Sequence, residues 1–406
     1  MKPLLDGKTL AKAIGAPPGP WMKDALDVVM AWQLRNPTEQ DPQAAIEAVK
    51  LHRQGSSNGN GELTSDLIRH FLQLTIRPLF LKAKPDSVTA EGRKPVSAAL
   101  PKKLSMRTED ESVVKPWKSA RDAYSLDLLR WVVGALDERV VKEVWPLVVP
   151  PILTLIDDWE AKYKSLGAEL LNGLLKSTAP DLLQRTGLGE VFEEALLPCL
   201  TCLPDLTPEK DAITLLNNVY PTLLTLCQVR YPITTTTNQA SPHRIKALDT
   251  LLRRGPLQSF SLCPPNYPSI IAVLLSHTTP VLDALGIDSV KHLKFLIPLL
   301  NDVLSHSQAF GPALENAVAA LQAVIRNCWP RMAVWRAEVL KGVCLCWVQI
   351  QGMEREEKLR ARLRESVKLI GMVVKAAEEV GVDWEAECRM LVEADGRVEG
   401  LFGREE

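Results

Sequence analysis

The sequence has few aromatic residues and few cysteines for its length. Aromatic side chains make up 5% of its 406 residues, and there are 8 cysteines. Strands are rich in aromatic and β-branched residues, whereas leucine favours helices, so a leucine-rich chain with few aromatic residues is typical of a helical protein. Cysteines this sparse do not form a disulfide framework, which indicates a reducing compartment.

The sequence also lacks an excess of charge and an uninterrupted membrane span. Its 48 Lys and Arg residues nearly balance 49 Asp and Glu residues, which argues against a general nucleic-acid or acidic-membrane binder. The apolar run 144–156 would extend about 20 Å as a helix, less than the ~30 Å of a bilayer core. The uncharged stretch 255–282 contains five prolines. We therefore predict a soluble protein whose 46% of hydrophobic residues form a large core.

Recognisable catalytic motifs are missing as well. There is no phosphate-binding GxxxxGK[ST] or GxGxxG loop, no HExxH motif and no Asp-x-Asp pair. Residues 55–59 match the G-x-S-x-G nucleophile motif formally, but they lie in a polar, glycine-rich stretch with no predicted strand before them. We predict that the chain is not an enzyme and binds no cofactor.

Two further motifs have simple structural interpretations. Cys199 and Cys202 have CxxC spacing, but no second pair completes a zinc site, so we interpret them as buried structural cysteines and predict no metal site. Asp157 and Asp158 could be paired carboxylates, but we interpret them as N-caps of the following helix.

Composition divides the chain into four parts. Residues 1–53 form a helical appendage, residues 54–62 read as a flexible linker, residues 63–121 hold a helix followed by a basic Pro-rich arm, and residues 122–406 are a run of helices. Residues 77–121 of the arm contain eleven basic and five acidic residues. This segment is either a solvated linker or an arm that lies against an acidic groove, on a partner or on this chain.

The sequence after residue 122 also contains a repeated pattern. A proline within an apolar stretch recurs at Pro151, Pro198 and Pro298, and each is followed by an Asp and a second apolar helix. A period of roughly 40–47 residues with paired helices is typical of HEAT and armadillo repeats. The sequence thus predicts an all-α fold, a HEAT/armadillo-like α-solenoid of about six or seven helix pairs with a small helical N-terminal appendage.

Candidate partner-binding residues lie near a predicted turn and on the arm. Proline in Trp329-Pro330-Arg331 ends or bends a helix, which leaves Trp and Arg near a turn. Trp and Arg are favoured anchors of protein interfaces. The candidates are Trp329, Pro330, Arg331, Trp335, Arg93 and Lys94.

Several motifs, taken in their order along the chain, resemble the family of Tel-two-interacting protein two. They are the arm segments 76–80 and 88–94, the stretch 150–158 with Lys164 and Gly167, the segment 185–188, and the segment 327–331. The resemblance runs from about residue 63 to 350 or beyond. It implies an α-solenoid, non-catalytic scaffold subunit of the three-protein TTT co-chaperone complex, located in the cytoplasm and nucleus.

The same resemblance implies partners. Tel-two-interacting protein one would bind directly, together with Tel-two. Through them the chain would act with the heat-shock-ninety chaperone system on phosphatidylinositol-3-kinase-related kinases, and so support the DNA-damage response, telomere maintenance and TOR signalling. Neither a membrane nor a nucleic acid is an expected partner.

The first fifty residues resemble a different family. Segments 4–10, 18–21 and 32–37 are similar to the C-terminal tail of CCA-adding tRNA nucleotidyltransferases. The catalytic head of that family, with its acidic metal ligands, is missing, so its activity is not implied. Two alternatives to the TTT subunit remain open: a nucleotidyltransferase-derived RNA-binding fragment, and a generic α-solenoid adaptor.

Overall fold

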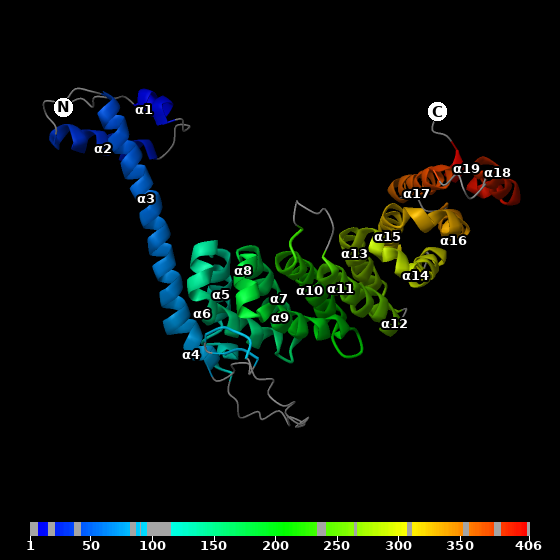
Figure 1. The fold of residues 1–406 in the computed structure, drawn as a ribbon, viewed down its shortest axis with the longest axis horizontal. Coiled ribbons are helices and arrows are strands. Elements are labelled where there is room, and N and C mark those ends of the chain that lie inside the picture. Colours follow the sequence, from blue (N-terminus) through cyan, green and yellow to red (C-terminus); the bar gives the residue numbers. More distant parts are fainter. Residues whose placement is uncertain are drawn as a thin grey trace. The chain divides into compact units, whose positions relative to one another are not determined.

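The computed structural model of the chain is built from helices (Figure 1). It describes residues 7–14, 21–35, 42–81, 87–89, 91–95, 115–233, 241–263, 266–306, 311–351, 357–376 and 383–403. None of these residues belongs to a β-strand, which confirms the all-α prediction. Contacts divide the chain into two compact units, Met1–Thr75 and Ile76–Glu406.

Unit 1 has a small hydrophobic core of its own. Helices α1 (Gly7–Ile14), α2 (Trp21–Arg35) and the first part of α3 (Pro42–His70) contact one another. The core contains Leu10, Ala25, Val29, Ala45, Ile46 and Val49. Helix α2 lies within the predicted helical appendage, and its buried residues Ala25 and Val29, four positions apart, lie on one face of the helix.

Helix α3 does not stop at the predicted linker. The backbone of residues 54–62 is helical, whereas their composition is typical of a flexible linker. The G-x-S-x-G match at residues 55–59 also lies within α3, with no strand before it, and its side chains lie outside the described residues. Three glycines lower helix propensity here by about 1 kcal/mol each relative to alanine. Composition reveals this penalty, but it does not reveal that the helical segments on both sides continue through residues 54–62.

Unit 2 contains two series of helices. Successive members of the first series contact each other in chain order. They are α7 (Ala161–Lys176), α10 (Glu209–Arg230), α13 (Pro268–Leu285), α15 (Leu314–Asn327) and α17 (Glu357–Ala376).

The second series alternates with the first along the chain, and its members pack against first-series helices. They are α6 (Glu138–Ile156), α9 (Leu188–Leu196), η4 (Leu197–Thr201), α11 (Pro242–Leu252), η5 (Arg253–Leu257), α12 (Gln258–Leu262), α14 (Leu293–Ser305) and α16 (Trp329–Ile350). The remaining short elements are η1 (Phe71–Ile76), α4 (Arg77–Phe80), η3 (Pro116–Lys118), α5 (Tyr124–Gly134), α8 (Pro180–Thr186), η6 (Gly286–His292), η7 (Gly311–Ala313), α18 (Trp384–Ala394), η9 (Gly396–Val398) and α19 (Glu399–Phe402).

The three prolines that suggested a repeat occupy comparable places. Pro151 lies in α6, Pro198 in η4 and Pro298 in α14, all in the second series. The next long helix after each is α7, α10 or α15, all in the first series. The sequence pattern therefore marks an alternation between the two series.

Leucine-rich stripes on the helices form the core of unit 2. On α7 the side chains of Leu170, Leu171, Leu174 and Leu175 are buried, and on α17 Leu359, Leu363 and Ile370 are buried. Gly167 allows α7 to approach α6 closely, because a Cβ at this position would lie 2.7 Å from the Ile156 backbone nitrogen.

One apolar stretch, Pro268–Ser305, has the length and composition of a membrane span. In the structure it comprises α13, η6 and α14 in succession. Buried residues of this stretch, such as Leu274, Leu282 and Leu300, belong to helices that pack against α10, α15 and α16. Its hydrophobicity is therefore accounted for by packing within unit 2.

Candidate functional site

The described residues 87–89 and 91–95 of the basic arm lie against the helices of unit 2. The indole Nε1 of buried Trp145 on α6 donates to the carbonyl oxygen of Gly92 at 3.1 Å. Gly92 has φ +68°, and a Cβ there would lie 3.0 Å from the Pro146 Cα. Both the left-handed backbone and the close approach require glycine at this position.

Lys94 continues this docking onto α8 and α9. Its backbone N–H donates to the Thr186 carbonyl oxygen at 2.9 Å, and its Nζ forms an ion pair with Glu190. The adjacent Gly187 has φ +68° and ends α8. The arm motif and the motif at residues 185–188, far apart in sequence, are thus in direct contact. Lys94, predicted to bind a partner, already binds α9, whereas the Arg93 side chain is exposed.

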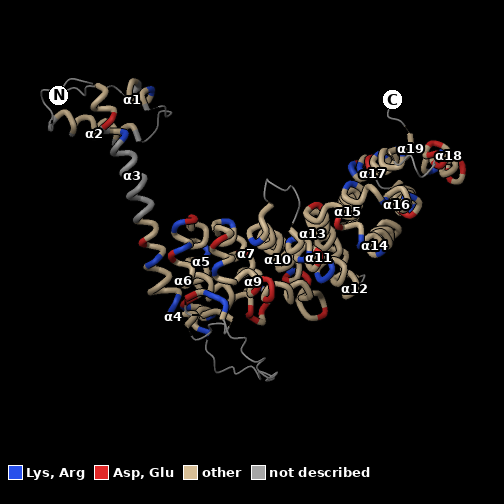
Figure 2. Tube along the Cα trace, in the orientation of Figure 1, with Lys and Arg blue, Asp and Glu red and all other residues tan. Residues whose placement is uncertain are grey.

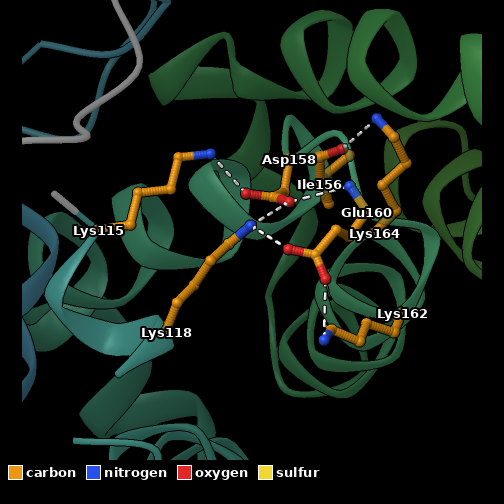
Figure 3. A network of polar contacts seen from close by, with 7 residues as sticks. All are labelled: Lys115, Lys118, Ile156, Asp158, Glu160, Lys162 and Lys164. Atoms are coloured by element: carbon orange, nitrogen blue, oxygen red, sulfur yellow. Dashed lines mark hydrogen bonds and ion pairs between the residues drawn. The ribbon is translucent and has the colours of Figure 1, made fainter. Parts of the chain in front are cut away.

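The arm residues from Lys115 onward meet the turn between α6 and α7. Asp158 is buried in this turn, with its side chain fully covered. Lys115 Nζ donates to its Oδ2 at 2.6 Å, and Lys118 Nζ donates to its Oδ1 at 2.8 Å (Figure 3). Lys118 also donates to Glu160 at 2.6 Å, so one ammonium group bridges two carboxylates.

These contacts shift the pKa values of the groups involved. Burial alone raises the pKa of Asp158, but the hydrogen bonds from Lys115 and Lys118 outweigh it and hold the pKa below its ordinary value. Burial likewise lowers the pKa of Lys118, but its bonds to Asp158 and Glu160 keep the pKa above its ordinary value. Both groups are therefore charged at neutral pH, and the cluster is an ion-pair network.

Aromatic rings complete the anchor. Trp117 is fully buried, stacks on Phe80 with 5.2 Å between ring centroids, and meets Tyr163 edge-on at 4.9 Å. Lys118 Nζ lies 4.6 Å from the centroid of Tyr163 and 5.3 Å from that of Trp117, within cation–π range. We call residues 115–118 with Asp158, Glu160 and Tyr163 the arm anchor.

The structure corrects the interpretation of the aspartate pair. Asp157 is the C-cap of α6, and the N-cap of α7 is Glu160, whose side chain makes no capping bond. Asp158 instead accepts the Glu160 backbone N–H at 3.0 Å, one residue before the helix, and binds the two lysines. Lys164 Nζ donates to the Ile156 carbonyl oxygen at 3.1 Å at the end of α6. The N-cap prediction is wrong because two basic residues from the arm, distant in sequence, use the carboxylate.

The cysteines fit the structural interpretation. Cys199 and Cys346 are buried, and Cys202 and Cys344 are half-buried. Burial raises the pKa of Cys199 to about 12, which keeps this thiol protonated and unreactive. Among the described residues there is no group of three or more potential metal ligands.

The other candidate residues lie at the start of α16. Pro330 occupies the first turn of this helix, so it begins a helix rather than ending one. Trp329 is 59% exposed and Val334 is 69% exposed. Pro330 and Arg331 are also exposed, and within the described part of the chain the Arg331 side chain has no hydrogen-bond or ion-pair partner. Trp335 is half-buried. We call residues 329–331, 334 and 335 the α16 ridge.

The structure therefore assigns the predicted residues to two separate places. Lys94 contacts α8 and α9, whereas the α16 ridge follows the turn after α15. The arm anchor was not predicted as a site. Two signals pointed toward it: the net charge of +6 in residues 77–121 and the adjacent acids at 157–158.

Basic and acidic residues are distributed along the helices of unit 2 (Figure 2).

Comparison with known proteins gives two kinds of similarity. The chain is 23% identical over 296 residues to TEL2-interacting protein 2 of Saccharomyces cerevisiae, covering 70% of this chain and 67% of the yeast protein. It is 62% identical over 53 residues to nucleotidyltransferase lcsQ of Purpureocillium lilacinum and 40% identical over 53 residues to tRNA nucleotidyltransferase cca2 of Schizosaccharomyces pombe. Each of these short matches covers 13% of this chain, but only 9% of lcsQ and 11% of cca2. No solved structure matches the chain.

A protein-family model settles which similarity covers most of the chain. The model of the Tti2 family matches residues 31–311, which include the docked arm and the arm anchor. This match begins earlier and ends earlier than the region 63–350 that the motifs indicated, and it does not include the α16 ridge. Since it covers more than half of the sequence, the chain belongs to the Tti2 family.

Proposed function

We propose that this chain is a non-catalytic scaffold subunit of a TTT-type co-chaperone complex. The observation that supports this most is the family match over residues 31–311, together with a relative named for its interaction with TEL2. The proposed role is to bind Tel-two-interacting protein one directly and Tel-two within the same assembly. The assembly would then serve the maturation of phosphatidylinositol-3-kinase-related kinases with the heat-shock-ninety system, in the cytoplasm and nucleus.

An α-solenoid of HEAT type is the architecture that this proposal assumes for unit 2. Two alternating series of helices, each packed on its neighbours, support it. In such an array every helix pair contacts only adjacent pairs, so helix edges and turns stay exposed along its length. Exposed edges suit a protein whose task is to bind another large helical protein.

We place the partner contact on the α16 ridge. Trp329 and Val334 expose apolar surface, and Arg331 is an exposed cation that no described residue pairs. Trp and Arg are among the residues that most often dominate the binding energy of a protein interface. Lys94 is not part of this proposal, because its ammonium group is engaged by Glu190.

The test is capture of Tel-two-interacting protein one from the same organism by the purified full chain. We expect the double variant Trp329→Ala and Arg331→Glu to weaken capture at least ~30-fold, about 2 kcal/mol or more, as expected for a hot spot. Trp159→Ala is the matched control, since Trp159 is also exposed but lies in the α6–α7 turn. Unchanged capture by the double variant would show that the partner binds elsewhere on the chain. No capture by the wild-type chain would reject the proposed complex.

A second candidate function follows from the nucleotidyltransferase similarity, which reaches 62% identity over 53 residues. The chain would then bind tRNA through a short segment shared with those enzymes. Fluorescence titration of the full chain with tRNA tests this, because RNA binding of this kind is micromolar and weakens steeply with salt. Absence of salt-sensitive binding would eliminate this candidate. Capture of helical proteins unrelated to TTT would instead favour a generic adaptor.

A further inference from the structure

A groove lies between α17 on one side and α18 with α19 on the other. It encloses about 880 Å³ and is open to solvent. The groove is outside residues 31–311 and distinct from the α16 ridge. Its lining includes apolar residues from all three helices: Val367, Met372, Trp384, Val392, Leu401 and Phe402.

The exposed methionine marks the groove as incompletely covered. Met372 is 60% exposed, although it faces a lining that includes buried Val367 and Leu401. Methionine adapts its unbranched side chain to differently shaped partners and is common on surfaces that bind helices. Gly371, beside it, lets Trp384 pack directly on α17, because a Cβ there would lie 2.7 Å from the indole nitrogen.

The two walls of the groove differ in charge. The α17 wall contributes three basic residues and no acidic residue: Arg364, Lys368 and Lys375. The opposite wall contributes three acidic residues and a single basic one: Glu385, Glu393 and Glu399, with Arg389. An occupant that matches this groove therefore needs acidic groups on one flank and basic groups on the other.

Two contacts across the groove give its length. Lys375 Nζ pairs with Glu385 at 3.1 Å toward one end, and Arg364 Nε donates to the Gly400 carbonyl oxygen at 2.9 Å toward the other. The interval from Arg364 to Lys375 corresponds to about 16 Å, or three turns, of α17. This length accommodates a helix of about three turns with apolar anchors at i, i+3 or i+4, and i+7.

We propose that this groove binds a short amphipathic α-helix of a partner protein, with an apolar stripe flanked by acidic residues toward α17 and basic residues toward α18. The apolar floor accepts the stripe, and the two walls select the charges. The inference does not depend on the TTT proposal, because it concerns different residues and a different test.

The probe is a synthetic helical peptide of about three to four turns with a leucine stripe, Glu along one flank and Lys along the other. A lactam bridge on its outer face keeps it helical, since isolated peptides of this length are marginal helices. Reversing a helix exchanges its flanks, so either arrangement of mixed flanks can match the groove. The discriminating controls therefore carry Lys on both flanks or Glu on both flanks.

Fluorescence anisotropy with the full chain measures the binding. We expect micromolar affinity for the mixed-flank peptide and at least ten-fold weaker affinity for both control peptides. Met372→Glu should weaken binding at least ten-fold. Met390→Glu should not, because Met390 is equally exposed on α18, at 61%, but does not line the groove. Circular dichroism checks that both variants are folded.

A charge switch provides a second measurement. Lys368→Glu replaces one of the three basic residues of the α17 wall with an acid and so lowers the net charge of that wall from +3 to +1. It should therefore weaken binding of the mixed-flank peptide and, by reducing repulsion, strengthen binding of the peptide with Lys on both flanks. Equal binding of all three peptides, no binding of any, or unchanged binding to Met372→Glu would each overturn the proposal. Concentration-dependent self-association that Met372→Glu abolishes, without peptide binding, would overturn it in favour of a second copy as occupant.

Discussion

Two short segments of this chain have similar composition but different surroundings. Lys115-Pro116-Trp117-Lys118 belongs to the arm anchor, and Trp329-Pro330-Arg331 begins the α16 ridge. In both, proline starts a helical turn beside a tryptophan and a basic residue. Trp117 is fully buried and the two lysines beside it bind Asp158, whereas Trp329 is exposed and the Arg331 side chain has no partner in the described part of the chain.

This difference shows that a nearby residue of opposite charge determines whether such a segment is fixed within the chain or is available to another molecule. A buried carboxylate within the chain is stable only when cations satisfy it, so Asp158 fixes the arm as part of the structure. No equivalent acid faces Arg331 among the described residues. The first segment is therefore an internal anchor, and the second is available to another molecule.

Replacing each tryptophan tests this contrast with the largest expected effect. Trp117→Ala should lower the free energy of unfolding by about 3–5 kcal/mol, since it removes a fully buried aromatic side chain. Trp329→Ala should change it by less than about 0.5 kcal/mol, as for most exposed positions. Urea denaturation measures both, and comparable losses in the two variants would contradict the assignment of an anchor and a ridge.

The buried carboxylate gives the next largest effect. Asp158→Asn keeps the shape of the side chain but removes the charge that Lys115 and Lys118 bind. Because both lysines remain partly exposed, we expect a loss of about 2–4 kcal/mol, at or below the range for breaking a buried pair.

Asp181→Asn is the matched control for that measurement. It removes an exposed pair with Arg185 within α8 and should cost less than about 0.5 kcal/mol. A loss for Asp158→Asn as small as that of the control would show that the arm does not depend on this carboxylate.

The pH dependence of stability is a further test of the ion pairs of Asp158. The pKa of Asp158 is lowered in the folded chain, so its contribution is present above the ordinary carboxyl pKa of about 3.9 and is lost as the pH falls through the folded value. The stability difference between wild type and Asp158→Asn should therefore narrow below about pH 4, by no more than about 1.4 kcal/mol per pH unit. A difference that stays constant from pH 7 to pH 3 would contradict the ion-pair assignment.

The sequence predicted the helices well because helical periodicity is local. The buried leucines of α7 and α17 recur at helical spacing, because the face of a helix is set by residues three or four apart. Residues 54–62 show the limit of local composition. Their glycines suggest a flexible segment, yet the backbone is helical because helical segments on both sides extend through them.

The candidate site was predicted less completely, because it depends on contacts between distant residues. The charge of the arm was evident, but its binding partner Asp158 lies 40 or more residues away and resembled an N-cap. Lys94 was predicted to bind a partner for its charge, and Glu190, 96 residues later, accounts for that charge. The exposure of Trp329 was predictable, since the proline beside it signals a helix boundary.

The ion pair between Lys94 and Glu190 gives the smallest expected effect. Removing it tests whether this ion pair or the other hydrogen bonds of the segment hold the arm on unit 2. Lys94 and Glu190 are both substantially exposed, so solvent screens their attraction. Lys94→Ala keeps the backbone bond to Thr186 and the bond from Trp145 to Gly92, which hold the same segment. We expect an unchanged midpoint of urea denaturation, in contrast to the large shift for Asp158→Asn. A comparable shift for Lys94→Ala would mean that the exposed ion pair, and not the buried contacts, holds the arm on unit 2.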